Sequence, residues 1–282
     1  MKIDVIILTR NEELNLSSCL QSIKLLGAKT WVVDSGSVDK TSDVAKTGGA
    51  EFVVHKEYMH QAQQFNWALD HLPLRGEWIL RLDADEWLTP ELIEEIKKRL
   101  TSEPQDVSGF YLKRRVYFMG RWIRHGGYYP TWMLRLFRRG KARCEEREMD
   151  EHIAVSEGRV ERMRYDFVDE NRKGLAAWTE KHNDFSTREA RARSAETQSE
   201  TILGGQAGRK RWFKQNFYGR LPLFCRAFIY FCYRYFFRLG FLDGIPGLIF
   251  HFLQGFWHQF LTDAKEYEMR GNPNYKGHER RS

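Results

Sequence analysis

RLDADEWL, residues 81–88, is the stretch of sequence that is most informative about the rest of the chain. An apolar run from Trp78 to Leu82 leads into Asp83 and Asp85, which have one residue between them. Hard cations such as Mg²⁺ and Mn²⁺ take oxygen ligands, usually one or two carboxylates completed by phosphates and waters. The pair therefore predicts a divalent metal site after a buried strand, with a solvated acidic turn as the alternative.

Strand and helix patterns alternate on both sides of this stretch, through the first 100 residues. Short apolar, β-branched runs predict strands, and a helical spacing of apolar side chains predicts the helices between them. The expected strands are 3–9, 31–33, 51–54 and 78–82, and the expected helices are 11–23, 39–46, 60–72 and one that starts at Pro90. This alternation predicts an α/β fold with a mostly parallel sheet flanked by helices.

Acidic residues follow three of these strands. Glu12 comes after the first strand, Asp34 after the second, and Asp83 with Asp85 after the fourth. Ligands of open α/β sheets bind at the carboxyl ends of the strands, near a reversal of strand order. A single aspartate at a strand end is more often a helix cap or a loop residue, but three acidic strand ends in one sheet favour a binding site.

Four segments occur in the order and spacing of a known family. ILTRNEELNLSSCLQSI, VVDSGSVDKT, FNWALD and RLDADEW together resemble the inverting glycosyltransferases of family two, which have the GT-A fold. The resemblance covers roughly residues 1–155. Within the family, the chain looks closest to bacterial enzymes that extend lipopolysaccharide cores or other surface polysaccharides.

The resemblance implies a donor site and a metal site. The donor would be a nucleotide sugar, foremost a UDP-sugar, and the cofactor Mg²⁺ or Mn²⁺ held by Asp85 with Asp83. Such a metal stabilises the diphosphate as it leaves with developing negative charge. The donor-binding residues implied by the family motifs are Thr9, Glu12, Asp34, Gly36, Asp39, Gln64, Asn66 and Asp83.

An inverting transfer also needs a general base near the acceptor hydroxyl. The segment MDEH contains Asp150 and Glu151 at the distance past the metal motif where the family carries this base. We expect Glu151 to be the base and Asp150 to be the second candidate, and a solvated charged loop is the alternative. Relatives carry a histidine near position 169, whereas this chain has Asp169 and Glu170 there.

The pattern changes after residue 107. Strands are expected at 109–118, 132–137 and 160–168, followed by a polar helix at 175–201. The loop between the first two is rich in glycine and aromatic residues, and aromatic rings pack against sugar faces. It predicts an acceptor rim made of Arg124, His125, Tyr128, Tyr129 and Trp132. For each arginine of this region, a surface salt bridge is the simpler alternative.

The second half of the chain is basic. Residues 1–100 carry 12 Lys and Arg against 16 Asp and Glu, whereas the remainder carries 33 against 22. Between Glu200 and Asp243 eight basic residues occur and no acidic one, and 18 of the 40 Phe, Trp and Tyr residues lie in 212–260. A basic, aromatic region suits an anionic membrane surface better than a nucleic acid.

Helical periodicity places Arg226, Arg234 and Arg238 on one arc of a helix, where we expect them to face anionic lipid. The run 245–261 has no charged Asp, Glu, Lys or Arg side chain but is shorter than a spanning helix needs. A helical subdomain or a homo-oligomer interface is the alternative. With four scattered cysteines and no signal-peptide pattern, the expected place is the cytoplasmic face of the inner membrane, with peripheral attachment.

The sequence thus predicts three regions. They are a GT-A domain at 1–203 (nucleotide-binding half 1–107, acceptor half 108–203), a basic, aromatic, helical membrane-interface region at 204–270, and a disordered tail at 271–282. Without a QxxRW motif, the expected reaction is transfer of a single sugar to a lipid-linked, lipopolysaccharide or surface-polysaccharide acceptor.

Other classes of function fit less well. A sugar nucleotidyltransferase needs a glycine-rich triphosphate loop near its N-terminus, and TRNEEL contains no glycine. A non-catalytic protein with a degenerate transferase domain is disfavoured by the intact acidic motifs. Nucleic-acid binding rests on the basic half alone, so we expect no nucleic-acid partner.

Overall fold

The computed structural model describes residues 2–57, 60–102, 104–145, 152–195 and 222–271. The chain separates into two compact units. The first comprises residues 1–124 and 128–174, and the second comprises 125–127 and 175–282. The boundary therefore falls earlier than the expected one at 203. The polar helix that was expected to complete the transferase domain packs in the second unit.

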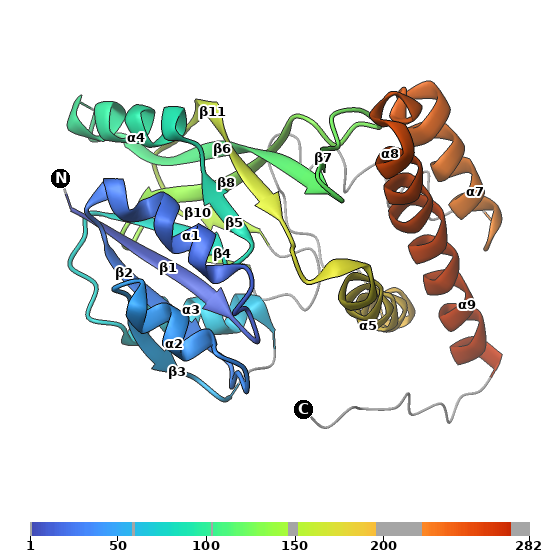
Figure 1. The fold of residues 1–282 in the computed structure, drawn as a ribbon, viewed down its shortest axis with the longest axis horizontal. Helices are drawn as coiled ribbons and strands as arrows, with labels where there is room; N and C mark the ends of the chain where they lie inside the picture. The colour runs from blue at the N-terminus through green and yellow to red at the C-terminus, as the bar shows by residue number, and fades with distance from the viewer. Residues whose placement is uncertain (1, 58–59, 103, 146–151, 196–221, 272–282) are drawn as a thin grey trace. The chain divides into compact units, whose positions relative to one another are not determined.

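Four parallel strands form one half of the main sheet (Figure 1). They are β1 (Ile3–Thr9), β2 (Lys29–Asp34), β3 (Glu51–Val54) and β4 (Trp78–Asp83), in the order β3-β2-β1-β4. Ile6 and Ile7 are both fully buried although they point to opposite faces of β1. A strand covered on both faces has no polar side to alternate, which explains the apolar run at residues 5–8.

The connecting helices are close to those expected from the sequence. They are α1 (Leu16–Ile23) with the short turn η1 (Lys24–Leu26), α2 (Thr41–Thr47), α3 (Gln61–His71) and α4 (Pro90–Ser102). The first helix begins five residues later than Asn11, because Asn11 has a positive φ of 54° and the chain turns there. The helix α3 begins with His60 as its N-cap, whose ring accepts from Gln63 N at 3.3 Å.

The second half of the sheet is mixed. Next to β4 lie β8 (Thr131–Arg138), β6 (Val107–Phe118), β11 (Arg159–Glu170) and β5 (Glu86–Leu88), and β7 (Arg121–Trp122) pairs with β6. β6 and β11 are parallel, whereas β8 and β5 run antiparallel to their neighbours. A separate hairpin joins β9 (Ala142–Cys144) to β10 (Ile153–Val155). The coarse expectation, an α/β fold with a curled sheet and flanking helices, is confirmed.

The sheet separates two hydrophobic cores. Val5, Ile7 and Leu82 face the core that α1 and α4 cover. Ile6 and Leu8 face the other core, which includes Phe65 of α3 and residues of the β9–β10 hairpin. The two covered faces leave the carboxyl ends of β1, β2 and β4 as the edge at which polar side chains collect.

The second unit is helical. It contains α5 (Gly174–Ala195), α7 (Cys225–Cys232), the π-helical turn η3 (Tyr233–Phe237), the 3₁₀ turn η4 (Gly240–Asp243), α8 (Gly244–Phe250), the π-helical turn η5 (His251–Trp257) and α9 (His258–Gly271). Within the described residues, no single helix is long and apolar enough to span a membrane. Residues 225–237 and 240–271, bent by 70° between them, have a suitable length and composition only as a pair.

Two of the three arginines expected to face lipid are instead buried. Arg226 donates from Nε to Asp263 at 2.7 Å and from Nη2 to Glu266 at 2.7 Å. Arg234 donates from Nε to the carbonyl of Gly126 at 2.7 Å. Periodicity grouped these arginines with Arg238 on one arc, whereas only Arg238 is exposed in the structure. Acidic and carbonyl groups distant in sequence provide the partners that keep the buried guanidinium groups satisfied.

Candidate active site

The strand order reverses between β1 and β4, and polar residues gather where these strands end. β2 and β3 lie on one side of β1, while β4 lies on the other. Thr9 ends β1, Asp34 ends β2 and Asp83 ends β4. A reversal of this kind opens a crevice at the carboxyl ends of the strands, where ligands of α/β sheets bind. The expected donor residues therefore converge on the edge predicted from the sequence.

Asp34 shapes the loop that follows β2. Its carboxylate is almost fully buried and accepts from Thr9 Oγ1 at 3.0 Å, from Gly36 N at 2.8 Å and from Ser37 N at 2.7 Å. Gly36 has a φ of 99°, which a side chain would strain. These contacts fix the SGS loop against the end of β1, so Asp34 forms the wall of the crevice.

Asp39 joins the same loop to the segment after β1. It accepts from Glu13 N at 3.1 Å and from Thr41 N at 3.0 Å. Thr41 Oγ1 in turn accepts from Glu12 N at 2.8 Å. The loops after β1 and β2 are therefore tied together by side chain to backbone hydrogen bonds, which hold Glu12 in place.

Glu12 is paired with a residue that the sequence did not single out. Lys173 Nζ lies 2.5 Å from Glu12 Oε1, and Asn15 Nδ2 donates to Glu12 Oε2 at 2.7 Å. Burial, followed by the nearby charge of Asp85, raises the pKa of Glu12, against the opposing effects of Lys173 and Asn15. The two residues of the ion pair are 161 positions apart, so no local pattern could have revealed it.

Glu86, the last acid of DADE, is buried beneath the metal motif. Its Oε2 accepts from Asp83 N at 3.0 Å, and Arg135 donates to both Glu86 Oε1 and Asp83 Oδ2. Burial, together with Asp83 and Asp169, raises the pKa of Glu86 to about 8, although Arg135 opposes the shift. Glu86 was not assigned a role from the sequence, and Arg135 was considered only as a phosphate ligand or a surface salt bridge, yet both position Asp83.

Asp85 is held differently from Asp83. It accepts from Asn171 Nδ2 at 3.1 Å, and within the described part of the chain no Lys, Arg or His lies within 4 Å of its carboxylate. An acid with a neutral partner keeps its charge available for a cation, whereas Asp83 shares its charge with Arg135. This difference agrees with Asp85 as the principal metal ligand.

The donor set fits a metal that is completed by its substrate. Among the described residues, no group of three or more His, Cys, Asp or Glu side chains could hold a metal ion. Mg²⁺ and Mn²⁺ bound with nucleotide phosphates commonly use only one or two carboxylates of the protein. Asp85 with Asp83 supplies such a set, and the phosphates of a nucleotide would complete it.

Gln64 and Asn66 are both buried and bonded to backbone. Gln64 donates to Val33 O at 3.2 Å. Asn66 donates from Nδ2 to Cys144 O at 2.9 Å and accepts from Cys144 N at 2.9 Å. Both hydrogen-bonding groups of Asn66 are thus used to attach α3 to the hairpin strand β9, next to the chain segment that precedes the expected base.

The expected base residues Asp150 and Glu151 lie outside the described residues. The hairpin on either side of them is described: Glu145 N donates to His152 O at 2.8 Å and closes the segment at its base. Ala142, Cys144 and Ile153 of this hairpin belong to the core on the α3 face of the sheet. Glu145 and His152, the described residues on either side of them, are therefore bonded to each other next to that core.

The residues of the expected acceptor rim fall in two different units. Arg124, Tyr128, Tyr129 and Trp132 belong to the first unit. His125 belongs to the second, where its backbone N–H donates to Asp243 Oδ2 at 2.9 Å and its Nδ1 lies 2.7 Å from Asp243 Oδ1. Gly126 N also donates to Arg238 O at 2.8 Å. Residues 125–127 thus form part of the helical unit's own hydrogen-bond network.

Bacterial glycosyltransferases are among the proteins similar to this chain. An uncharacterised glycosyltransferase of Rickettsia bellii is 37% identical over 105 residues, which are 37% of this chain and 35% of the relative. The match thus spans about a third of the length of this relative. The lipopolysaccharide core biosynthesis glycosyltransferase LpsC of Rhizobium meliloti is 28% identical over 288 residues, which cover 97% of this chain and 96% of that protein.

A solved structure shares the fold at low identity. The mannosyltransferase PcManGT of Pyrobaculum calidifontis, in complex with GDP-Man and Mn²⁺, matches with a TM-score of 0.54 and 15% identity, over 94% of this chain and 86% of that one. The model of the family described as glycosyl transferase family 2 matches residues 4–148, which include every element of the parallel half-sheet and the acidic motif. The chain belongs to glycosyl transferase family 2.

Proposed function

We propose that this protein transfers one sugar from a nucleotide-sugar donor to an acceptor hydroxyl, with inversion at the anomeric carbon and with the help of a divalent metal. The observation that carries the proposal is the meeting of Glu12, Asp34, Asp83 and Asp85 at the reversal of strand order in a family 2 chain. Each of these acids has fixed neighbours, so the site is preorganised before the donor arrives.

In this proposal, different residues of the site contact the ribose, the base and the diphosphate of the donor. Glu12, held beside Lys173, accepts from a ribose hydroxyl, while the loop held by Asp34 encloses the base. Asp85, with Asp83, would hold Mg²⁺ or Mn²⁺ against the diphosphate. Bound there, the metal neutralises the charge that develops on the leaving nucleoside diphosphate. The complex of PcManGT with GDP-Man and Mn²⁺ supports a nucleotide-sugar donor and a divalent metal, and a UDP-sugar remains our first choice.

The acceptor side provides the base. In an inverting transfer, the acceptor hydroxyl attacks the anomeric carbon from the face opposite the diphosphate while a carboxylate takes its proton. Glu151, or Asp150 beside it, fills this role in our proposal. Their place between β9 and β10 supports it, because Asn66 fixes the hairpin to α3, whose residues line the same sheet face.

The acceptor we propose is lipid-linked, lipopolysaccharide or another surface polysaccharide. The likeness to LpsC supports a lipopolysaccharide acceptor, since it extends over 97% of this chain. Other relatives give no information on the acceptor.

A donor screen tests the transferase activity. Purified protein is incubated with UDP-, GDP- and dTDP-sugars and Mn²⁺, and release of the nucleoside diphosphate is followed with and without lipopolysaccharide acceptors. We expect one donor to be turned over, and Asp85→Asn or excess chelator to reduce the rate at least about 100-fold, as for other transition-state charge contacts. Glu91→Gln, an exposed acid on α4, is the matched control. Release of pyrophosphate from a nucleoside triphosphate would instead indicate a nucleotidyltransferase.

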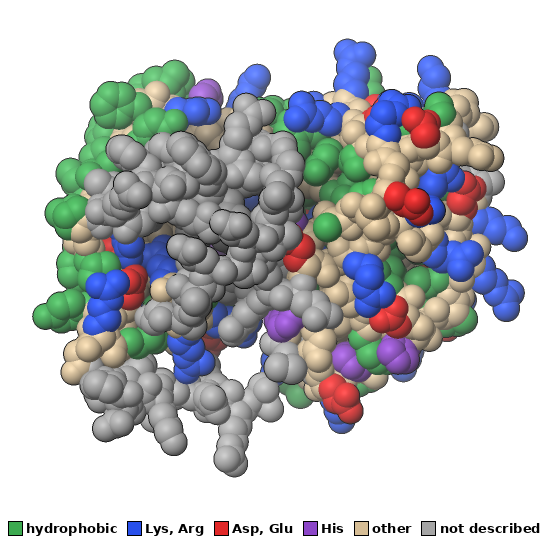
Figure 2. All heavy atoms as spheres, turned by 180° about the vertical axis from the view of Figure 1, so that it is seen from behind, with side chains coloured by type: hydrophobic (Ala, Val, Ile, Leu, Met, Phe, Trp, Pro, Cys, Tyr) green, Lys and Arg blue, Asp and Glu red, His purple; other side chains and the backbone are tan. Residues whose placement is uncertain are grey.

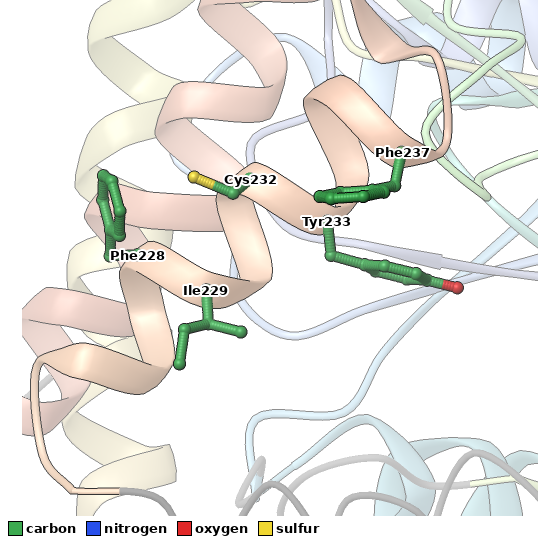
Figure 3. Close-up of a pocket in the computed structure, with 5 residues that line it drawn as sticks. All are labelled: Phe228, Ile229, Cys232, Tyr233 and Phe237. Carbon is green, nitrogen blue, oxygen red and sulfur yellow. The ribbon is translucent and has the colours of Figure 1, made fainter.

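We further propose that the helical unit attaches the protein peripherally to the inner membrane surface. Large apolar side chains are exposed on α7, η3 and α8: Phe237 is 79% exposed, Ile245 74% and Phe228 60%. Figure 2 shows hydrophobic side chains gathered over these helices. Phe228, Ile229, Cys232, Tyr233 and Phe237 line an apolar groove of about 330 Å³ (Figure 3). Contiguous apolar surface of this kind is rare on monomers and marks an interaction site.

Arg238 is the arginine of the expected arc that stays at the surface, beside Phe237. With Arg226 and Arg234 turned inward, insertion of apolar side chains into the lipid, more than charge, drives the attachment we propose. A residue such as Phe or Ile gains about 1.5–3 kcal/mol when it leaves water. Two such residues therefore account for a binding change of at least about 100-fold.

Vesicle sedimentation tests this attachment. The full chain is mixed with vesicles of phosphatidylethanolamine and phosphatidylglycerol, and the double variant Phe237→Ser, Ile245→Ser is compared with Leu25→Ser. Leu25 is 65% exposed and lies in the first unit, so it controls for the loss of a surface apolar residue. We expect only the double variant to lose binding. A dimer by light scattering that the double variant converts to monomer, without vesicle binding by either protein, would identify a homo-oligomer interface instead.

A further inference from the structure

Two tryptophans of the first unit each lie between two cationic side chains. Lys113 Nζ is 5.8 Å and Arg162 Cζ 4.9 Å from the ring of Trp132. Arg115 Cζ is 4.4 Å and Arg124 Cζ 5.2 Å from the ring of Trp122. We call this set, Lys113, Arg115, Trp122, Arg124, Trp132 and Arg162, the cationic-aromatic patch. From the sequence only Arg124 and Trp132 were assigned to the acceptor.

The register of the sheet brings the patch together. Lys113 on β6 is paired with Trp132 on β8 and with Asp166 on β11. Side chains of paired residues project to the same face of a sheet. Arg115, two residues further along β6, points to that face as well. One surface is thus formed by side chains of β6, β7, β8 and β11.

One buried acid organises the patch. Asp166, 5% exposed, lies 2.7 Å from Arg115 Nη2 and 3.4 Å from Lys113 Nζ, and Tyr129 donates its hydroxyl to it at 3.1 Å. In the described part of the chain, no carboxylate lies within 4 Å of the exposed side chains of Arg124 or Arg162. Only two of the four cations therefore contact a carboxylate, and the patch has charge left for an anion.

The patch lies on the acceptor side of the proposed active site. Tyr111, two residues before Lys113 on β6, packs against the core that contains Cys144 and Ile153 of the β9–β10 hairpin. The patch thus shares a sheet face with the hairpin on either side of the expected base. Along β11, Asp166 of the patch lies three residues, about 10 Å, before Asp169, which is paired with Glu86 of β5. This distance along the strand corresponds to one or two sugar rings.

We propose that the cationic-aromatic patch binds the acceptor, and that the acceptor is an acidic saccharide, with phosphate or carboxylate groups on its sugars. The inference rests on the proposed transferase function and specifies its acceptor class. Arginine and lysine donate charge-assisted hydrogen bonds to phosphate and carboxylate oxygens. The tryptophan rings hold the four cations in place, which reduces the side-chain entropy lost on binding. The exposed ring edges give the sugar an apolar surface to pack against.

A titration that needs no turnover tests the patch. Protein labelled with ¹⁵N-tryptophan is titrated with glucose 6-phosphate, glucose and inorganic phosphate, and the indole signals of Trp122 and Trp132 are assigned from Trp→Phe variants. We expect both signals to shift with glucose 6-phosphate, with an affinity at least about fivefold above that for either glucose or phosphate. The double variant Arg124→Gln, Arg162→Gln is expected to weaken the binding about tenfold.

Arg164→Gln is the control, since Arg164 is an exposed arginine of the same strand whose backbone N–H is bonded to Glu95 of α4. Equal affinities for glucose and glucose 6-phosphate, or unchanged binding by the double variant, would overturn the proposal. Inorganic phosphate that binds as tightly as glucose 6-phosphate would also overturn it, because the patch would then select no sugar. Binding of UDP to the same samples reports the donor site separately, so loss of donor turnover alone affects only the proposed function.

Discussion

Glu86 Oε2 accepts a hydrogen bond from the backbone N–H of Asp83 at 3.0 Å, so a buried acid holds the turn that carries the metal motif. Arg135 donates to the carboxylates of both residues. The orientation of Asp83 is thus set by groups that a bound donor need not touch. A preorganised acid of this kind loses little free energy to reorientation when a metal and a diphosphate arrive.

Replacement of Glu86 tests this arrangement. Glu86→Ala leaves Arg135 buried with one carboxylate in place of two and leaves the N–H of Asp83 without its acceptor. Because burial raises the pKa of Glu86 to about 8, its pair with Arg135 is not fully charged at neutral pH. We expect the free energy of unfolding to fall by about 1–3 kcal/mol, the cost of leaving a buried polar group unsatisfied. Glu86→Gln keeps an acceptor for Asp83 and should lose less. Urea unfolding measures both, with Glu91→Ala as the exposed control; equal stability of Glu86→Ala and this control would contradict the role.

Lys173 is expected to control the protonation of Glu12. Lys173→Met removes a cation that lowers the pKa of Glu12, so the burial that already raises this pKa acts with less opposition. Protonated Glu12 accepts more weakly from a ribose hydroxyl than the carboxylate does. As the pH falls, binding of UDP should therefore weaken at a higher pH in the variant than in the wild type. Calorimetric titrations between pH 5 and 8 measure the effect, with Lys46→Met on α2 as control. Parallel pH profiles for the wild type and Lys173→Met would refute the coupling.

The parallel half of the sheet was predictable because its signals are local. β1 is nearly all apolar, and α4 begins at Pro90 as expected from the fixed φ of proline. Strands β5, β7, β9 and β10 have only two or three residues. This is too few to show the alternation of apolar and polar residues that identifies a strand. Short strands of this kind form because neighbouring strands offer them partners, which is tertiary information.

The site was predictable at its acidic strand ends and not in the groups that position them. Arg135 is 49 residues from Glu86, and Lys173 is 161 residues from Glu12. Partners this far apart in the sequence produce no periodic pattern of residues that could reveal them. The inward turn of Arg226 likewise depends on Asp263 and Glu266, 37 and 40 residues later. Helical periodicity indicates which side chains share a face of the helix, whereas partners distant in the sequence decide whether a side chain turns inward.

Asn66 is expected to support the acceptor side through backbone. Asn66→Ala removes two hydrogen bonds to the buried backbone of Cys144, at a cost of about 1–3 kcal/mol for each group. We expect the β9–β10 hairpin to open locally, so that transfer slows while UDP binding stays unchanged. Hydrogen exchange at the amide of Cys144 measures the opening, and Gln61→Ala on the same helix is the control. Loss of UDP affinity in Asn66→Ala would mean that the amide contacts the donor directly.

His251 gives the helical unit a dependence on pH. Its ring is fully buried between Gly126 and Gly240, where an added Cβ would come within 2.1 Å and 2.6 Å of the ring atoms. Burial, and then the charge of Arg234, lowers the pKa of His251 to about 4, although Asp243 opposes the shift. Between this value and the ordinary one near 6.5, the unfolded chain takes up a proton that the folded unit does not.

Stability of the helical unit should therefore fall as the pH drops from 6.5 to 4, by about 3 kcal/mol for a shift of this size. Hydrogen exchange of peptides from residues 244–258 measures the loss. His251→Gln, which cannot take up a proton, should show a flatter dependence, whereas His71→Gln in the first unit should keep the full slope. His182, whose pKa burial also lowers to about 4, adds a second contribution that remains in both variants. An unchanged slope in His251→Gln would exclude His251 as the titrating group and leave His182 to account for it.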